Sequence, residues 1–152
     1  MLRDAGKQDK AEIYELWKQS YPNQNRNYLN FYFKNIFDKG RCIALEQDQR
    51  IISSLQLNEH ILRLRDKQLK ISYILGVSTL PDYRRRGHMR RLMESALDEA
   101  GHNHLVTLIR GFYPKLHAQF GFETVYERQL YTVRRECLHK VSLTYISSAA
   151  EP

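Results

Sequence analysis

Residues 84–91 of this 152-residue chain read Arg84-Arg85-Arg86-Gly87-His88-Met89-Arg90-Arg91 and are its most informative segment. It follows an apolar, strand-like run and opens an amphipathic helix. The N-terminus of a helix carries a partial positive charge and favours Asp or Glu, so five arginines there are unfavourable unless an anion binds. Free backbone N–H groups at a helix start bind phosphate well. The segment therefore predicts a phosphate-binding loop; the alternative is a solvated basic helix start without a ligand.

The residues on either side of this loop predict a strand, a helix and a second strand. Upstream, Ile71 to Val77 is almost wholly apolar, as expected for a strand covered on both faces. Downstream, apolar residues recur at helical spacing from Met89 to Ala100, and Gly101 is expected to end that helix. Leu105 to Ile109 has the composition of a buried strand. A strand, a crossover helix and a strand form a βαβ unit, so these two strands are predicted to be parallel.

Two helices are predicted near the N-terminus. Asp9 to Tyr21 has helical periodicity, and Asp9 with Glu12 three residues later resembles a capping box. Asn27 to Phe37 has aromatic residues near helical spacing, a feature that is more often core packing than a ligand site.

From residue 42 the period changes to that of strands. Cys42 to Leu45 and Ile51 to Leu57 flank a polar turn at 47–49. The second run is expected to extend to Leu64 and to turn at 66–67, which leads back into the apolar strand before the arginine loop. These segments predict an antiparallel meander.

The C-terminal third is less well patterned. Lys115 to Phe120 suits a short helix with Gly121 as its C-cap, and Phe122 to Val133 suits one or two strands. Val141 to Ile146 has weak strand character. Together with the preceding elements, this order predicts an α/β (α+β) protein with a mixed sheet.

Composition limits the classes of protein. The 42% hydrophobic and 27% charged residues are ordinary for one globular domain. No run approaches the ~20 apolar residues of a membrane span, and no signal peptide is visible, which predicts a cytoplasmic protein without a membrane partner. Cys42 and Cys137 are too few for a disulfide framework, and neither they nor the histidines have metal-ligand spacing, so no metal is expected.

The net charge of +7 raises the question of nucleic acid, but its distribution argues against it. Five of these charges lie in the segment 84–91, which leaves the rest of the chain with about +2. A single basic cluster favours a small anionic ligand over a long polyanion.

The loop resembles the acetyl-CoA signature of the GNAT superfamily of N-acetyltransferases. In that signature Gln or Arg is followed by Gly three residues later and by Gly or Ala two residues after that. Arg84 and Gly87 match the first two positions, whereas Met89 departs from the third. The longer pattern from Gly76 to Met93 is still more similar to the amino-terminal domain of Eis-like acetyltransferases, where Met is familiar at that place.

A second segment supports the resemblance, which covers most of residues 1–135. GNAT proteins often carry Phe-Tyr, three residues and Gly-Phe late in the domain, and Leu116 to Phe122 lies there. The resemblance implies a GNAT-like fold: a mixed, mostly antiparallel central sheet with a splayed parallel pair, flanked by helices. Residues 136–152 are then a strand or tail, or a linker to a missing domain. Because Eis-like proteins are usually longer, the chain is expected to be a minimal relative or a fragment.

The resemblance also implies a site for acetyl-CoA as co-substrate. Backbone groups at the end of the strand would pair with the pantetheine amides as an added strand would. Backbone N–H groups of the loop would hold the pyrophosphate, and arginine side chains would neutralise the 3′-phosphate. The implied cofactor-binding residues are Val77, Ser78, Thr79, Arg84, Arg85, Arg86, Gly87, His88, Met89 and Arg90.

Acetyl transfer also needs a deprotonated amine and a proton for the thiolate. In many GNAT proteins the Tyr of the late segment protonates the thiolate; His117 holds that place here and is the predicted general acid. Water or Tyr113 is the alternative donor, and a merely structural histidine is the alternative role. The strand 69–77 has no carboxylate, so the general base stays open, with Glu59 or His60 as candidates.

The function implied is an acetyl-CoA-dependent N-acetyltransferase that moves an acetyl group directly to a primary amine. The alternative is a CoA-binding or protein-interaction module of GNAT fold with little or no turnover. Aminoglycosides, polyamines, peptide amines and small metabolites all stay open as acceptors, and a homo-oligomer is compatible with the sequence.

Overall fold

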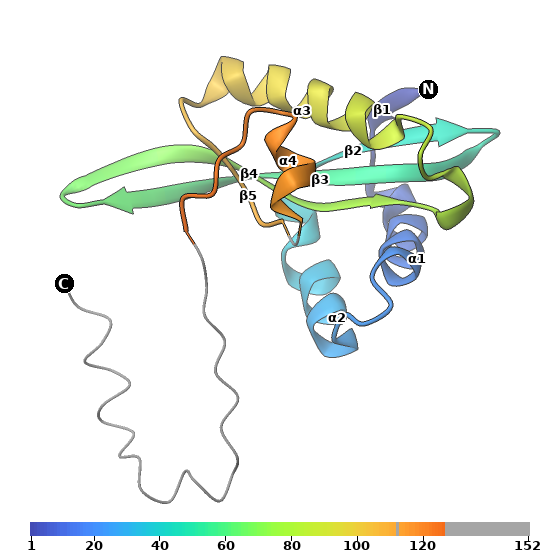
Figure 1. The fold of residues 1–152 in the computed structure, drawn as a ribbon. Helices are drawn as coiled ribbons and strands as arrows, with labels where there is room; N and C mark the ends of the chain where they lie inside the picture. The colour runs from blue at the N-terminus through green and yellow to red at the C-terminus, as the bar shows by residue number, and fades with distance from the viewer. Residues whose placement is uncertain (112, 127–152) are drawn as a thin grey trace, which may run out of the picture. The chain divides into compact units, whose positions relative to one another are not determined.

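The computed structural model describes residues 1–111 and 113–126, which contain one five-stranded sheet in the order β1-β2-β3-β4-β5 (Figure 1). The strands are β1 (Leu2–Asp4), β2 (Arg41–Gln47), β3 (Arg50–Leu64), β4 (Lys67–Thr79) and β5 (Thr107–Ile109). The α-helices are α1 (Lys10–Ser20), α2 (Arg26–Asn35), α3 (His88–Asn103) and α4 (Pro114–Ala118). Pairing from β1 to β4 is antiparallel, whereas β4 and β5 are parallel. The predicted fold class is confirmed.

The predicted meander is also confirmed, because its turns have the backbone that tight hairpins need. Asp48 and Gln49, between β2 and β3, have φ of 51° and 59°. Two consecutive positive φ angles match the right-handed twist of the flanking strands. β3 ends at Leu64 as expected, but the next turn lies at 65–66 rather than 66–67 and begins with Arg65, which has a φ of 56°.

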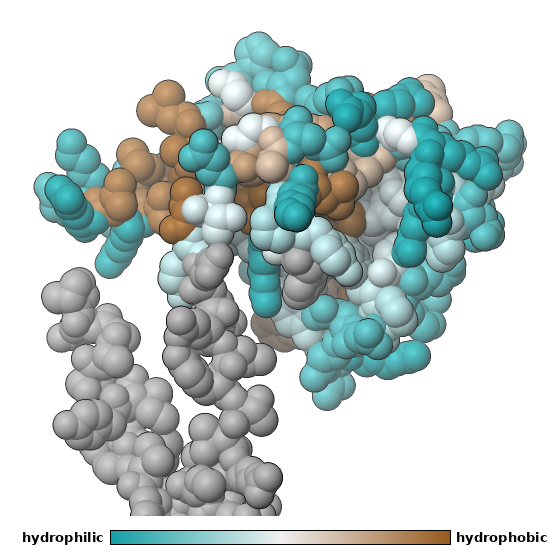
Figure 2. All heavy atoms as spheres, in the orientation of Figure 1, coloured by the Kyte–Doolittle hydropathy of each residue, from teal (hydrophilic) through white to brown (hydrophobic). Residues whose placement is uncertain are grey.

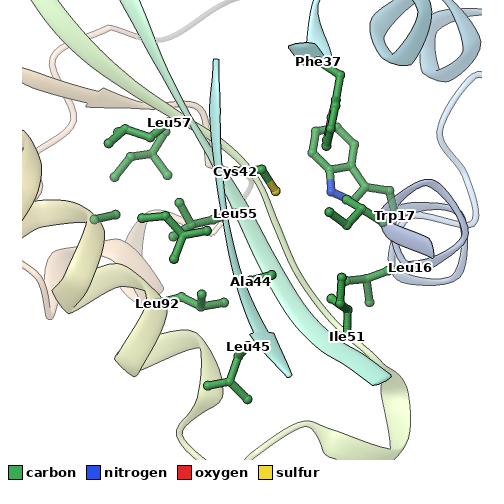
Figure 3. Close-up of a cluster of buried hydrophobic side chains, with 14 of the residues drawn as sticks. Leu16, Trp17, Phe37, Cys42, Ala44, Leu45, Ile51, Leu55, Leu57 and Leu92 are labelled. Carbon is green, nitrogen blue, oxygen red and sulfur yellow. The ribbon is translucent and has the colours of Figure 1, made fainter. Parts of the chain in front are cut away.

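Helices cover both faces of the sheet, with α3 on one side and α1 and α2 on the other (Figure 1). Side chains alternate along a strand, so neighbouring residues pack against opposite layers. Figure 3 shows Leu45 and Leu55 on the side of α3 with Leu92, and Ala44 on the side of α1 with Leu16. All five are at most 2% exposed. Burying each leucine stabilises the fold by ~1.5–3 kcal/mol, so the sheet is held from both sides.

The predicted capping box at α1 is wrong. Asp9 makes no side-chain cap to this helix; its carboxylate accepts hydrogen bonds from the Arg3 guanidinium at 2.7 and 2.9 Å and from the Gly6 N–H at 2.7 Å. Glu12 instead accepts from the Ile51 N–H of β3 at 2.8 Å. Both carboxylates therefore join α1 to distant segments, a role that local spacing does not reveal.

Three further expectations differ from the structure. The helix α3 runs two residues beyond Gly101, to Asn103, because an exposed glycine inside a helix costs only ~1 kcal/mol. The strand β5 is shorter than predicted, and Leu105 is 99% exposed rather than buried. Figure 2 shows hydrophobic residues gathered at the end of the view where the β3–β4 hairpin lies.

The strand β1 was not predicted, because its three residues are too few to show an alternating hydrophobic pattern.

The C-terminal predictions fall only partly on described residues. Pro114–Ala118 forms the short helix α4, and Gly121 has a φ of 82° beyond it. Residues 122–126 are not strand, which contradicts the start of the strand expected at Phe122. The remainder of that segment, the strand expected at 141–146 and the boundary at residue 135 lie outside the described residues.

Candidate functional site

The candidate site is shaped by a β-bulge in β4. Ser54 of β3 is opposite Ser78, but Gln56 is opposite Leu75, so β4 carries one extra residue between these pairs. Gly76 lies in the bulge with a φ of 62°, and a Cβ there would be 1.7 Å from Cζ2 of Trp17. Only glycine fits both the backbone conformation and the close approach of the indole.

Beyond this bulge β4 and β5 separate. The parallel pairing covers only Ser72 to Ile74 of β4, against Thr107 to Ile109 of β5. The rest of β4, residues 75–79, has no strand partner on that side among the described residues. The backbone there faces a cavity of about 960 Å³, here called the fork pocket.

The fork pocket collects residues from four parts of the chain. They come from the end of α1 and the following loop, from β4, from the start of α3, and from the segment after β5. Nine of the ten predicted cofactor-binding residues line it: Val77, Ser78, Thr79, Arg84, Arg85, Gly87, His88, Met89 and Arg90. Arg86 does not; its guanidinium lies 5.5 Å from the centroid of the Tyr83 ring.

At the start of α3 the backbone N–H groups are uncapped. Gly87 is the N-cap with a φ of 77°, and no side chain caps the helix. Arg91 is the first residue whose N–H bonds back, to the Gly87 carbonyl at 3.1 Å. A Cβ on Gly87 would meet nothing within 4 Å, so the backbone conformation, rather than crowding inside the protein, explains the glycine. The free N–H groups of this first turn are suited to an anion.

The loop arginines are exposed, and two of them have contacts that orient the loop. Arg84 donates from Nε to the Thr79 carbonyl at 3.2 Å. Arg90 donates to Oε1 of Gln119 at 2.9 Å and lies 5.7 Å from the centroid of the Phe120 ring. The second contact ties the start of α3 to the segment that follows α4, so both walls of the fork pocket are joined there.

His88 contributes more than the backbone that its sequence position suggested. Both ring nitrogens are buried without a hydrogen-bond partner among the described residues. Burial lowers the pKa of His88, and the charges of Arg91 and Arg86 lower it further. His88 therefore stands in the pocket wall as a neutral imidazole near pH 7, with neither nitrogen hydrogen-bonded to a described residue.

His117 lies in the wall of the same pocket. Its side chain belongs to α4, is 9% exposed and has Nδ1 buried without a described partner. Burial lowers the pKa of His117. Its ring packs edge-on to Phe122 with centroids 6.4 Å apart, and a Cβ on Gly111 would lie 2.3 Å from Nε2. Tyr113, the alternative donor, lines the same pocket but is 73% exposed.

The two candidate bases lie elsewhere. Glu59 does not line the fork pocket; it pairs with Nζ of Lys70 and Nε2 of His104, each at 3.2 Å, which lowers the pKa of Glu59. His60 packs against Tyr73 with centroids 5.2 Å apart and is likewise outside the pocket lining. Nδ1 of His104 forms a hydrogen bond with the Ser72 hydroxyl at 2.8 Å and so holds the end of α3 to the sheet.

Two further pocket residues, Tyr21 and Arg110, belong to no sequence motif and were not predicted. The loop after α1 contributes Tyr21, whose hydroxyl donates to the Val77 carbonyl in the bulge region. Burial raises the pKa of Tyr21 to about 12. Arg110, directly after β5, also lines the pocket. The position of Tyr21 just before Pro22, where a helix must end, was the only available signal.

The described residues contain no group of three His, Cys, Asp or Glu side chains arranged to hold a metal ion. Likewise, no helix in the part of the chain described here has the length and hydrophobicity to span a membrane.

Several solved structures are similar in fold to this chain. A conserved Enterococcus faecalis protein described as a probable N-acyltransferase is 16% identical with a TM-score of 0.70; the match covers 80% of this chain and 31% of that one. A Brucella melitensis GNAT family acetyltransferase in complex with acetyl-CoA is 18% identical with a TM-score of 0.70, covering 82% of each. An Acinetobacter haemolyticus aminoglycoside 6′-N-acetyltransferase is 13% identical with a TM-score of 0.66, covering 88% and 98%.

These likenesses show the fold. The chain spans less than a third of the Enterococcus protein but nearly all of the Acinetobacter one. No curated protein sequence matches the chain. The family model for the acetyltransferase (GNAT) domain matches residues 1–125, a range that contains the forked strands, the arginine loop and His117. The chain therefore belongs to the GNAT family of acetyltransferases.

Proposed function

We propose that this protein transfers the acetyl group of acetyl-CoA directly to a primary amine. The observation that carries the proposal is the fork pocket, which joins an uncapped helix start to a buried histidine in one cavity of about 960 Å³. One end of this cavity suits an anion, and the other suits proton transfer.

Acetyl-CoA fits the residues present. The N–H groups from Arg85 to Arg90 would hold the pyrophosphate, and the unpaired nitrogens of His88 offer a further contact to the cofactor. The edge of β4 at 77–79, which has no strand partner on that side among the described residues, would pair with the pantetheine amides. Acetyl-CoA supplies the activated acetyl group; the protein supplies its orientation.

The reaction moves one proton. The amine nitrogen bonds to the thioester carbonyl carbon, the carbon–sulfur bond breaks, and a proton passes from nitrogen to sulfur. Because burial lowers the pKa of His117, its imidazole is neutral near pH 7. A neutral His117 would take the proton from the amine and then act as the acid that delivers it to the sulfur. No carboxylate base is then required.

A thiol-release assay tests the proposal. Purified protein, acetyl-CoA and a panel of primary amines are expected to release CoA at a rate that depends on the amine and to yield the N-acetyl product by mass spectrometry. Calorimetry measures acetyl-CoA binding in parallel. Binding without release for any amine would indicate a CoA-binding or protein-interaction module and would contradict the enzymatic proposal.

Narrower assignments are also proposals. The closer relation to Eis-like acetyltransferases is supported by the pattern from Gly76 to Met93. The acetyltransferase domain is proposed to extend to residue 135. A cytoplasmic location is also proposed, because Cys42 and Cys137 are too few for a disulfide framework of the kind that secreted domains use.

A further inference from the structure

The fork pocket has an unusual charge pattern for an enzyme that acts on amines. Its described lining contains no Asp or Glu, but it contains four arginines. Three of these, Arg84, Arg85 and Arg90, lie at the start of α3, where the cofactor phosphates are proposed to bind. The fourth, Arg110, follows β5 on the other arm of the fork.

Arg110 is exposed and, like Arg84 and Arg85, has no ion pair with any described residue, whereas Arg90 pairs with Glu94 at 3.8 Å. It lies close enough to Tyr73 of β4 for its charge to act on the phenol: burial raises the pKa of Tyr73, and Arg110 opposes that rise. Tyr73 is opposite Asn58 in the sheet, and Asn58 bonds the hydroxyl of Tyr32 in α2. Arg110 is therefore associated with the α2 side of the sheet, opposite the face covered by α3.

We infer that Arg110 binds a carboxylate of the acceptor, so that the acceptor is an amine of the amino-acid class rather than a polycation. This inference rests on the proposed acetyl transfer. A guanidinium forms paired, charge-assisted hydrogen bonds with a carboxylate. Conversely, a polyamine or aminoglycoside would bring several ammonium groups beside the Arg110 guanidinium, and the described pocket lining has no carboxylate to pair with them.

Matched acceptors test this inference. The twenty standard L-amino acids are compared with their carboxamides, which keep the α-amine and lose the carboxylate; spermidine and neamine represent the polycations. At least one free amino acid is expected to exceed its carboxamide, and both polycations, by tenfold or more in kcat/KM. Arg110→Met is expected to reduce that ratio to below threefold, with the KM for acetyl-CoA changed by less than threefold.

A control variant and a conservative variant separate charge recognition from folding. Lys115→Met removes an exposed cation of α4 that does not line the pocket, and the acid-to-amide ratio is expected to stay at its original value. Arg110→Lys is expected to restore part of the ratio, because it restores the charge without the paired geometry. Equal circular-dichroism spectra and melting temperatures establish that each variant is folded.

Three results would overturn the assignment of Arg110. They are faster turnover of spermidine or neamine, a carboxylate preference that survives in Arg110→Met, and loss of acetyl-CoA affinity in that variant, which would place Arg110 at the cofactor. These results leave the proposed acetyl transfer standing. Normal acetyl-CoA binding without turnover of any acceptor would instead contradict the transfer itself, and this inference with it.

Discussion

At the residue scale, the site depends on a glycine that makes room for a histidine. Gly111 has no sequence motif of its own, yet any side chain there would overlap the imidazole of His117, with 2.2 Å to Cδ2 and 2.3 Å to Nε2. The ring is held by Phe122 on another side. The position of His117 in the fork pocket is therefore set by two neighbours rather than by a hydrogen bond to Nδ1 within the described chain.

Gly111→Ala should consequently displace His117. We expect a loss in kcat of ~10²-fold, the usual contribution of a positioned acid or base, with little change in acetyl-CoA affinity. Gly101→Ala is the control: its new Cβ meets nothing within 4 Å, and alanine inside α3 should raise the unfolding free energy by ~1 kcal/mol without affecting kcat. Unchanged turnover in folded Gly111→Ala would show that the position of His117 does not matter.

The lowered pKa of His117 predicts a pH dependence. If the neutral imidazole takes the proton from the amine, kcat/KM should fall as the pH drops through the folded-state pKa of His117, below the ordinary value of ~6.5. His117→Ala should lose ~10²-fold in kcat and lose this acidic limb as well, whereas His117→Tyr should recover part of the rate. A His117→Ala enzyme with near-normal turnover would leave water or Tyr113 as the proton donor.

At the scale of elements, the start of α3 combines free backbone N–H groups with the positive charges of the arginine loop. Its N–H groups are free because Gly87 adopts a left-handed conformation and no side chain caps the helix. The bulge in β4 and the short β5 then place this helix start at one end of the pocket. The free N–H groups of the helix start alone, or the bulge and the short β5 alone, would not create an anion site that is open toward His117.

Gly87→Glu is expected to abolish acetyl-CoA binding, since it places a negative charge where the pyrophosphate is proposed to bind. Gly87→Ala is the matched control: it carries the same backbone strain, ~1–2 kcal/mol for a left-handed residue, without the charge. We expect calorimetry to show binding by the alanine variant and none by the glutamate variant. Equal affinities for the wild type and the glutamate variant would contradict the site.

At the scale of the whole molecule, charge is concentrated where the cofactor is proposed to bind. Five of the net charges of +7 come from residues 84–91, and this cluster is exposed. Figure 2 shows hydrophilic residues covering the end of the view where the loop between β4 and α3 lies in Figure 1. Such a cluster attracts anions from solution.

Acetyl-CoA affinity is therefore expected to fall with ionic strength. Exposed arginine–phosphate pairs are screened as the Debye length shrinks from ~10 Å at 0.1 M salt to ~3 Å at 1 M. Titrations at several salt concentrations should show a dissociation constant that rises with salt, and less steeply in Arg85→Gln. A constant that does not change with salt would indicate that the arginines stay in solvent when the cofactor is bound.

The parts of this protein that depend on local pattern could be predicted from the sequence. The arginine loop at a helix start, the parallel strands around α3, the hairpin turns and the family likeness all follow from residues close together in the chain, because backbone conformation and amphipathic periodicity are local properties. The candidate base Glu59 shows the limit, since its pairing with His104 joins segments 45 residues apart.

The surroundings of each functional group, in contrast, became known only from the folded structure. The lowered pKa of His117 arises from burial, which no spacing encodes, and Gly111 acquires its role only once α4 folds over it. Arg110 enters the pocket because β5 ends after three paired residues, and Tyr21 because α1 ends beside the bulge in β4. These properties come from packing between segments far apart in the chain, so the acceptor side of the pocket could not be predicted from the sequence. The cofactor loop could be predicted because its residues are consecutive in the chain.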